Sequence, residues 1–153
     1  MGSRVYARRA KERGEKIVAM LSLETIGCFT DVPKSQHYPP PFNLFYPDTG
    51  NFVGFVSDLG SRALLLRTIG TFRATTHFPS EGLAAPGWIE GIGWSDHWSF
   101  WQEGYPAVMV TDTAPFRYLH YHEAEDTPEK LDYERMARVV AGIGRVVVNL
   151  SND

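Results

Sequence analysis

Residues 93–127 read GWSDHWSFWQEGYPAVMVTDTAPFRYLHYHEAEDT, and this stretch predicts an α/β fold. Its first part predicts a short helix, which Ser95 caps and Gly104 ends. Pro106–Val110 is a short apolar run with the length and valine content of a buried strand. The chain then enters a polar loop that carries His122. A loop after the carboxyl end of a buried strand is where α/β folds place their chemistry.

The composition indicates one globular domain, residues 1–153, because 43% of the residues are hydrophobic. The 15 basic and 18 acidic side chains give a net charge of −3, which argues against general nucleic-acid binding. No apolar run approaches the ~20 residues of a membrane span, and the N-terminus lacks the apolar core of a signal peptide. We expect a soluble, cytoplasmic chain without nucleic-acid or membrane partners, although a secreted origin of a longer parent stays open. The one cysteine, Cys28, rules out an internal disulfide.

Helices and short strands alternate along the rest of the chain. Apolar spacing and capping residues predict three long helices, over Arg4–Arg13, over about Leu59–Ala74 and from near Asp132 onwards. Short apolar runs predict three strands, at Ile17–Leu23, Phe52–Val56 and Ala107–Val110. Two segments are predicted as loops, Thr25–Gly50 and Phe78–Gly93, and the aromatic residues of the first favour a loop that packs down. Helices that separate short apolar strands predict a mainly parallel sheet.

Two polar residues stand where such a fold would place its chemistry. Glu24 lies at the carboxyl end of the first predicted strand, and its alternative role is a carboxylate that caps neighbouring groups or faces solvent. His122 lies two residues from His120 and four residues before Asp126, which could orient an imidazole. A loop histidine by itself is usually just exposed. The residues alone leave both interpretations open.

Three motifs occur in order and at compatible spacing. They are AMLSLETIG at Ala19–Gly27, SDHxxF at Ser95–Phe100 and YHxxxDT at Tyr121–Thr127. Together they resemble the carboxyl-terminal half of the di-zinc aminopeptidase family, whose relatives include glutaminyl cyclases and glutamate carboxypeptidases. The resemblance runs from about Gly2 to Leu150. It implies a three-layer α/β sandwich with a mostly parallel sheet that lacks the family's amino-terminal strands.

The resemblance also implies roles for residues at matching positions. Glu24 matches a zinc ligand, and His122 matches a ligand of the second zinc. Tyr121 matches a catalytic tyrosine that hydrogen-bonds the tetrahedral intermediate. The predicted substrate pocket comprises Asp96, His97 and Phe116. The implied activity is zinc-dependent removal of amino-terminal residues from peptides.

Other parts of that family's site are missing from this sequence. The family's remaining ligands and its general base lie on a His-x-Asp motif, a bridging aspartate and a Glu-Glu pair, and the chain contains neither His-x-Asp nor Glu-Glu. Zinc usually keeps three or more protein ligands, whereas two matching positions remain here. We therefore expect weak zinc binding or none, and no peptidase activity from this chain alone. The alternatives are a site completed by another chain or segment, a non-catalytic domain that binds peptides or a partner, and a truncated gene fragment.

A sheet without its neighbouring strands should also expose an edge and the apolar faces of helices. An uncovered edge is a template for pairing with another chain, and large apolar patches usually mark interfaces. The sequence therefore predicts a homo-oligomer, most simply a two-fold dimer. The other expected partner is a peptide, as substrate or ligand.

Overall fold

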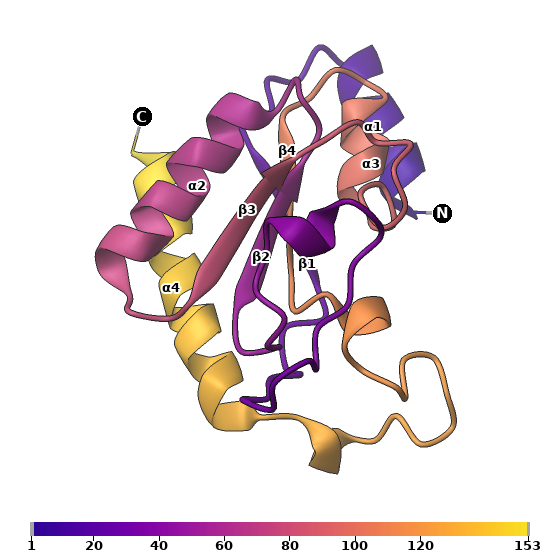
Figure 1. Cartoon of the computed structure of the whole chain (residues 1–153). Coiled ribbons are helices and arrows are strands. Elements are labelled where there is room, and N and C mark those ends of the chain that lie inside the picture. The colour runs from indigo at the N-terminus through magenta and orange to yellow at the C-terminus, as the bar shows by residue number, and fades with distance from the viewer. Residues whose placement is uncertain (1, 153) are drawn as a thin grey trace.

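A four-stranded sheet with helices on both sides forms the molecule, and Figure 1 shows this arrangement. The computed structural model describes residues 2–152, so Met1 and Asp153, the ends of the predicted domain, lie outside the described residues. The strands are β1 (Met20–Glu24), β2 (Val53–Ser57), β3 (Ser80–Ala84) and β4 (Ala107–Thr111). The helices are α1 (Gly2–Glu12), α2 (Arg62–Thr75), α3 (His97–Trp101) and α4 (Tyr133–Ser151), with 3-10 turns η1 (Phe42–Leu44), η2 (Ala114–Phe116) and η3 (Pro128–Lys130). Within residues 2–152, no helix combines the length and apolarity needed to cross a membrane.

The sheet has the strand order β1-β4-β2-β3, so β1 and β3 form its two borders. β1 pairs with β4 in parallel, β2 pairs with β3 in parallel, and the central pair β2 and β4 is antiparallel. Thr111 of β4 lies opposite Glu24 on one side and opposite Gly54 of β2 on the other. These three residues therefore form one row across three strands.

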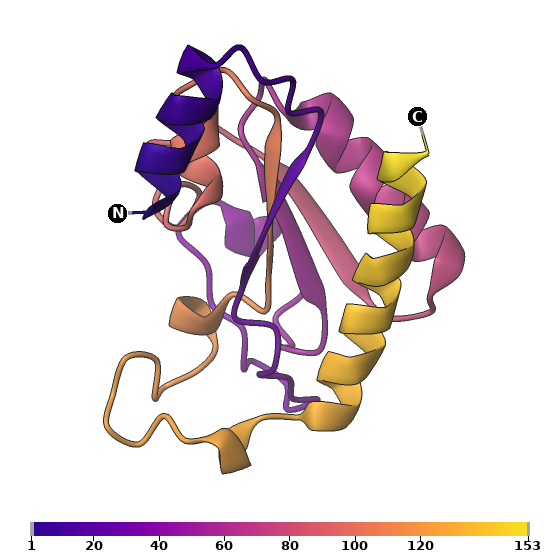
Figure 2. The ribbon, with the colours of Figure 1, turned by 180° about the vertical axis from the view of Figure 1, so that it is seen from behind.

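Helices cover both faces of the sheet (Figures 1 and 2). On one face, α2 and α4 pack side by side over inward-facing side chains such as Phe55 and Val108. On the other face, α1 and α3 pack against Ala107 and the start of β1. Ala107 and Val108 point to opposite faces because successive side chains alternate along a strand. The predicted α/β class, with helices in layers on both sides of a mostly parallel sheet, is confirmed.

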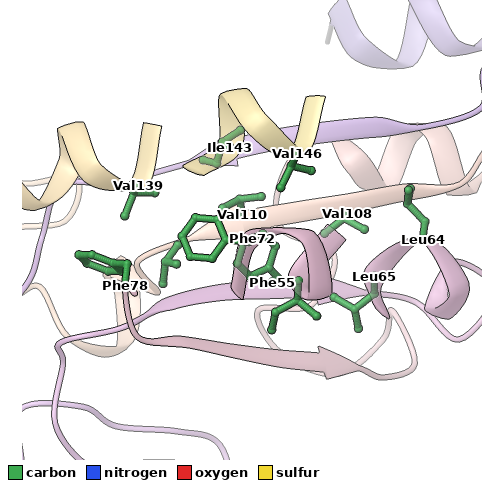
Figure 3. Close-up of a cluster of buried hydrophobic side chains, with 12 residues drawn as sticks. Phe55, Leu64, Leu65, Phe72, Phe78, Val108, Val110, Val139, Ile143 and Val146 are labelled. Atoms are coloured by element: carbon green, nitrogen blue, oxygen red, sulfur yellow. The ribbon is translucent and has the colours of Figure 1, made fainter. Parts of the chain in front are cut away.

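The larger core lies between the sheet and the α2/α4 layer, as Figure 3 shows. Val139, Ile143 and Val146 recur at three- and four-residue spacing and form the buried stripe of α4. Phe72 of α2 is fully buried beside them. A Cβ atom at Gly142 would lie 2.4 Å from the Phe72 ring, so the close approach of the two helices requires a residue without a side chain.

The structure corrects two predictions about strands. Pairing with β4 begins at Met20, opposite Ala107, so the first part of the predicted strand, 17–19, lies outside β1, and Ile17 packs against the cluster under α1 and α3. The segment Phe78–Gly93, predicted as loop, contains β3. β3 has the sequence Ser-Glu-Gly-Leu-Ala, without a β-branched residue, so local propensity carried no strand signal. Its strand conformation comes from parallel pairing with β2.

The helices are present with shifted ends. α2 begins at Arg62 and not at Leu59, because the Asp58 carboxylate accepts a hydrogen bond from the Ser61 N–H at 2.7 Å and holds a turn before the helix. α4 begins directly after Asp132, whose side chain accepts a hydrogen bond from the N–H three residues on. Asp132 therefore caps the helix where the sequence predicted its start.

The long segment Thr25–Gly50 is ordered and packs on the sheet, as its aromatic residues indicated. Phe42, in η1, packs against the buried cluster that contains Val56 of β2. The Tyr46 hydroxyl donates a hydrogen bond to the carbonyl oxygen of Gly82 in β3, at 2.9 Å. The segment thus covers part of the sheet face opposite α2 and α4, and it supplies one side of the site described next.

Candidate functional site

Glu24 is the last residue of β1, at the carboxyl end where the sequence placed it. The chain turns sharply after it, because Thr25 has a φ of 47°, in the left-handed region that non-glycine residues rarely adopt. The Thr25 hydroxyl donates a hydrogen bond to the Glu24 carbonyl oxygen at 2.7 Å. The Glu24 side chain lines a pocket on the sheet face away from α2 and α4.

Asp112 holds this turn in place, and sequence reasoning missed it. It follows β4 directly, and its N–H donates to the Thr25 carbonyl oxygen at 2.8 Å. Its Oδ2 accepts hydrogen bonds from the N–H groups of Gly27 and Cys28, at 2.8 and 2.7 Å. The residue is fully buried, and burial raises the pKa of its carboxyl group. An acidic residue just after an apolar strand was the signal that could have identified it.

Arg117 is a partly buried polar residue that the sequence did not single out. Its Nη1 donates to the carbonyl oxygen of Phe52 at 2.9 Å, and its Nε donates to Oε1 of Gln36 at 2.7 Å. Its guanidinium lies 4.6 Å from the centre of the Phe52 ring, in a cation–π contact. Burial lowers the pKa of Arg117 to about 10, so it stays charged at neutral pH. It ties the segment after β4 to the long 25–50 segment.

Tyr121 and His122 lie on the loop between η2 and η3, which extends away from the sheet in Figure 1. Their rings stack with centres 4.0 Å apart. Tyr121 is partly buried and lines the same pocket as Glu24. Burial, and secondarily the charge of Glu24, raises the pKa of Tyr121, so its phenol remains a hydrogen-bond donor at neutral pH. His122 is exposed, has a φ of 63° and is not among the residues that line the pocket.

Asp126 does not orient His122 in this structure. Its Oδ1 accepts a hydrogen bond from the Tyr118 hydroxyl at 2.9 Å. The Tyr118 ring also contacts His120, with ring centres 5.4 Å apart. Asp126 and His120 therefore both contact Tyr118, whereas His122 stacks on Tyr121.

The predicted pocket residues lie in two different places. Phe116 lines the pocket, where it stacks on Trp94 with ring centres 6.3 Å apart. Asp96 and His97 are not among the lining residues of the pocket. Asp96 precedes α3 at its cap position, without a capping side-chain bond, and the predicted cap Ser95 pairs with the Ser22 hydroxyl at 2.8 Å.

His97 is fully buried below the pocket. Its Nε2 lies 2.7 Å from the carbonyl oxygen of Ile92, which can only accept, so Nε2 carries the proton. The ring also meets Trp101 edge to face, with centres 4.4 Å apart. Burial lowers the pKa of His97, which keeps the imidazole neutral. Because Ile92 lines the pocket, His97 supports the pocket from behind.

A zinc ion would need a third donor near the two predicted ligands. Among residues 2–152, no group of three or more His, Cys, Asp or Glu side chains is arranged to hold a metal ion. Structural and catalytic zinc sites keep at least three protein ligands. The donor set of the described chain therefore does not fit a zinc site by itself, and no catalytic step through a metal follows from it. Burial raises the pKa of the Cys28 thiol to about 12.

Comparison with known families decides the membership of this chain. The model of the family described as peptidase family M28 matches residues 1–147. The chain belongs to peptidase family M28. This M28 chain is 37% identical over 150 residues to the Escherichia coli (strain K12) protein named "Uncharacterized protein YfbL". The match covers 97% of this chain and 46% of YfbL, so the chain spans about half the length of that relative.

Two solved aminopeptidases share the fold of this M28 chain. The Legionella pneumophila LapA aminopeptidase superimposes with a TM-score of 0.67 at 16% identity, over 99% of this chain and 36% of that one. The aminopeptidase from Aneurinibacillus sp. strain AM-1 superimposes with a TM-score of 0.55 at 22% identity, over 95% of this chain and 29% of that one. The resemblance inferred from the three motifs is thus confirmed for the family and the fold.

Proposed function

We propose that this chain is the substrate-binding part of a metal-dependent aminopeptidase. In this role its pocket holds the first side chain of a peptide. Glu24 and His122 would be among the residues that hold zinc once further donors are supplied, and Tyr121 would donate a hydrogen bond to the oxyanion that develops on the scissile carbonyl. The remaining ligands and the general base come from another segment or another chain. The reaction is hydrolysis of the amino-terminal peptide bond.

One observation carries this proposal: Glu24 and Tyr121 line the same pocket, although they lie 97 positions apart in the sequence. The pocket opens at the carboxyl ends of β1 and β4, where α/β folds bind their ligands. Membership of a peptidase family supports a peptide as the ligand.

A second candidate function is a non-catalytic domain that binds peptides or a partner. It is favoured by the donor set, because only two side chains match zinc-ligand positions and the described residues gather no third donor around them. Both functions use the same pocket, so metal binding and turnover separate them.

The experiment combines metal analysis with activity. The purified chain is dialysed, its zinc content is measured, and hydrolysis of aminoacyl-p-nitroanilides is assayed. The same measurements follow after mixing with the part of YfbL that this chain does not cover. We expect little zinc and no turnover from the chain alone. The mixture should hold zinc and turn over substrate, and both should be lost in Glu24→Ala and His122→Ala.

Two results would change the proposal. One or more tightly held zinc ions per chain alone would mean that ligands within this chain have been missed, with His120 the first to examine. A mixture that forms a complex but neither holds zinc nor hydrolyses substrate would favour the non-catalytic domain. Tyr121→Phe tests the proposed donor: it should lower turnover and leave the zinc content unchanged.

A further inference from the structure

Two side chains that follow β4 hold the backbone of Cys28. Oδ2 of Asp112 accepts a hydrogen bond from the Cys28 N–H at 2.7 Å, and Nη1 of Arg117 donates one to the Cys28 carbonyl oxygen at 3.2 Å. Cys28 lies four residues after Glu24, beyond the sharp turn at the end of β1. The segment 112–117 therefore binds both polar backbone groups of a residue on the chain that leaves β1.

We propose that Asp112 and Arg117 act together as one clamp, which positions the two sides of the pocket relative to each other. One side carries Glu24, and the other carries Phe116 and Tyr121. Asp112 and Arg117 are positioning residues, because neither is among the described residues that line the pocket. The inference rests on the proposed function, since it concerns the geometry of the same site, and neither residue lies in the three sequence motifs.

Asp112 acts on the side of the pocket that carries Glu24. Its N–H donates a hydrogen bond to the Thr25 carbonyl oxygen at 2.8 Å, and its Oδ2 also accepts one from the Gly27 N–H at 2.8 Å. Thr25 follows Glu24 directly and has a φ of 47°, a conformation that a non-glycine residue keeps only when the surrounding structure holds it. The direction in which β1 presents the Glu24 side chain therefore depends on Asp112.

Arg117 acts on the opposite side, because it follows Phe116 directly in the chain. Its Nε donates a hydrogen bond to Oε1 of the buried Gln36 at 2.7 Å. The Thr113 hydroxyl donates to the same oxygen at 2.9 Å. The next residue along, His37, donates its N–H to the Phe116 carbonyl oxygen at 2.8 Å. These bonds hold Phe116 and the start of the loop that follows it.

The clamp depends on the geometry of its donors and acceptors. The planar guanidinium of Arg117 donates in fixed directions to three acceptors, which are Oε1 of Gln36 and the carbonyl oxygens of Cys28 and Phe52. Arg117→Lys keeps the positive charge but lacks this fork of donors, so it should open the clamp. Asp112→Asn keeps an oxygen that can accept from the same two N–H groups, so it should leave the clamp closed.

Hydrogen exchange followed by NMR on the full chain tests the coupling between the two sides. The amide protons of residues 27–28 report on the first side, and that of His37, which bonds to Phe116, reports on the second. Each rate is divided by that of the slowest core amides, which removes changes in global stability. We expect faster exchange at 27–28 in Arg117→Lys and at His37 in Asp112→Ala, each by about tenfold. In both cases the acceptor of the amide itself is kept, so only coupling can produce the effect.

Turnover by the reconstituted mixture gives a second measurement. Arg117→Lys and Asp112→Ala should lower kcat about tenfold or more, because small displacements of positioned groups slow a reaction strongly. Asp112→Asn should keep most of the parent's kcat. Gly142→Ala is the matched control: a Cβ at this position would meet the Phe72 ring between α2 and α4, so the variant is destabilised without a change in the clamp. Its exchange ratios and its kcat should equal those of the parent.

Three outcomes would overturn the inference. Exchange that becomes faster only at amides bonded directly to the substituted side chain would mean two independent contacts. Effects of Asp112→Asn as large as those of Asp112→Ala would remove the geometric basis of the clamp. Coupled exchange with an unchanged kcat in an active mixture would mean that the clamp does not position the site. If exchange is coupled but the parent mixture shows no turnover, the clamp stands and only the proposed hydrolysis fails.

Discussion

At the scale of single residues, His97 holds a neutral imidazole inside the protein. Its Nε2 donates to the Ile92 carbonyl oxygen, and its buried Nδ1 has no hydrogen-bond partner. Protonation of Nδ1 would place a positive charge in a site that offers no acceptor for it. The His97 imidazole therefore binds a proton less readily in the folded protein than in the unfolded chain.

This difference predicts a dependence of stability on pH. The pKa of His97 is lower in the folded than in the unfolded state, so between the two values the unfolded chain binds more protons. The free energy of unfolding should therefore fall as pH drops from 7 through the unfolded value near 6.5. Urea unfolding at pH 7 and at pH 5.5 measures this change in the free energy of unfolding. His97→Gln, which keeps an N–H donor, should show a smaller change between the two pH values; an equal change would assign the effect to other groups.

Asp112 gives a prediction about buried hydrogen bonds. Asp112→Ala leaves the N–H groups of Gly27 and Cys28 without their acceptor, which should cost about 2 kcal/mol or more of unfolding free energy. Asp112→Asn keeps an oxygen for both N–H groups and should stay within about 1 kcal/mol of the parent. Urea unfolding of the two variants separates these effects. Equal losses would mean that the negative charge, and not the acceptor geometry, is what matters.

The site could be predicted from the sequence mainly where its residues lie in a local pattern, and Phe116 is a predicted pocket residue outside the three motifs that also lines the pocket. Glu24 and Tyr121 stand in motifs, and both line the pocket. Asp112 and Arg117 act on backbone groups that lie far away in sequence, such as those of Cys28 and Phe52, so no local spacing reveals them. Contacts between residues that are distant in sequence depend on the fold, so they can be identified only from the three-dimensional structure.

At the scale of elements, α4 contains a matched pair of glycines. A Cβ at Gly142 would meet the buried Phe72 ring at 2.4 and 2.8 Å, whereas a Cβ at Gly144 would meet nothing within 4 Å. Gly142→Ala should therefore destabilise the protein by about 1–3 kcal/mol through overpacking. Gly144→Ala should stabilise it by about 0.5–1 kcal/mol, since alanine favours a helix. Thermal unfolding compares the two. A stabilised Gly142→Ala would mean that α2 and α4 separate at little cost.

The helix α4 and the strand β3 show which elements local sequence can predict. α4 has an apolar stripe of helical period and a capping Asp132, so its start could be predicted to within one residue. β3 has no comparable pattern, because it is a border strand whose conformation depends on β2 beside it. Local periodicity thus predicts elements that bury one face, and it misses those that pairing alone creates.

At the scale of the whole molecule, we propose that two copies associate along β1. This strand has β4 on one side only, and a border strand presents backbone groups that another strand can pair with. Leu23 is 50% exposed and Val18 is 61% exposed beside that border. Two such borders can meet antiparallel about a two-fold axis, which gives a self-complementary contact.

Light scattering at micromolar concentration tests the association. The parent chain should behave as a dimer, and Leu23→Lys should shift it toward monomer, because two like charges would meet in the contact. Leu119→Lys is the matched control, since Leu119 is 92% exposed and lies on the loop far along the chain from β1. A well-dispersed monomeric parent would contradict the proposal, as would equal effects of both lysines.

The border position of β1 has a practical consequence. Glu24 ends a border strand, so the groups that would complete the site from beyond that strand could be supplied as a separate polypeptide. Reconstituted hydrolysis would then depend on the concentration of both pieces, as any association does. If two other proteins were fused to the two pieces, binding between those proteins would bring the pieces together. Peptide hydrolysis would then serve as the signal for that binding.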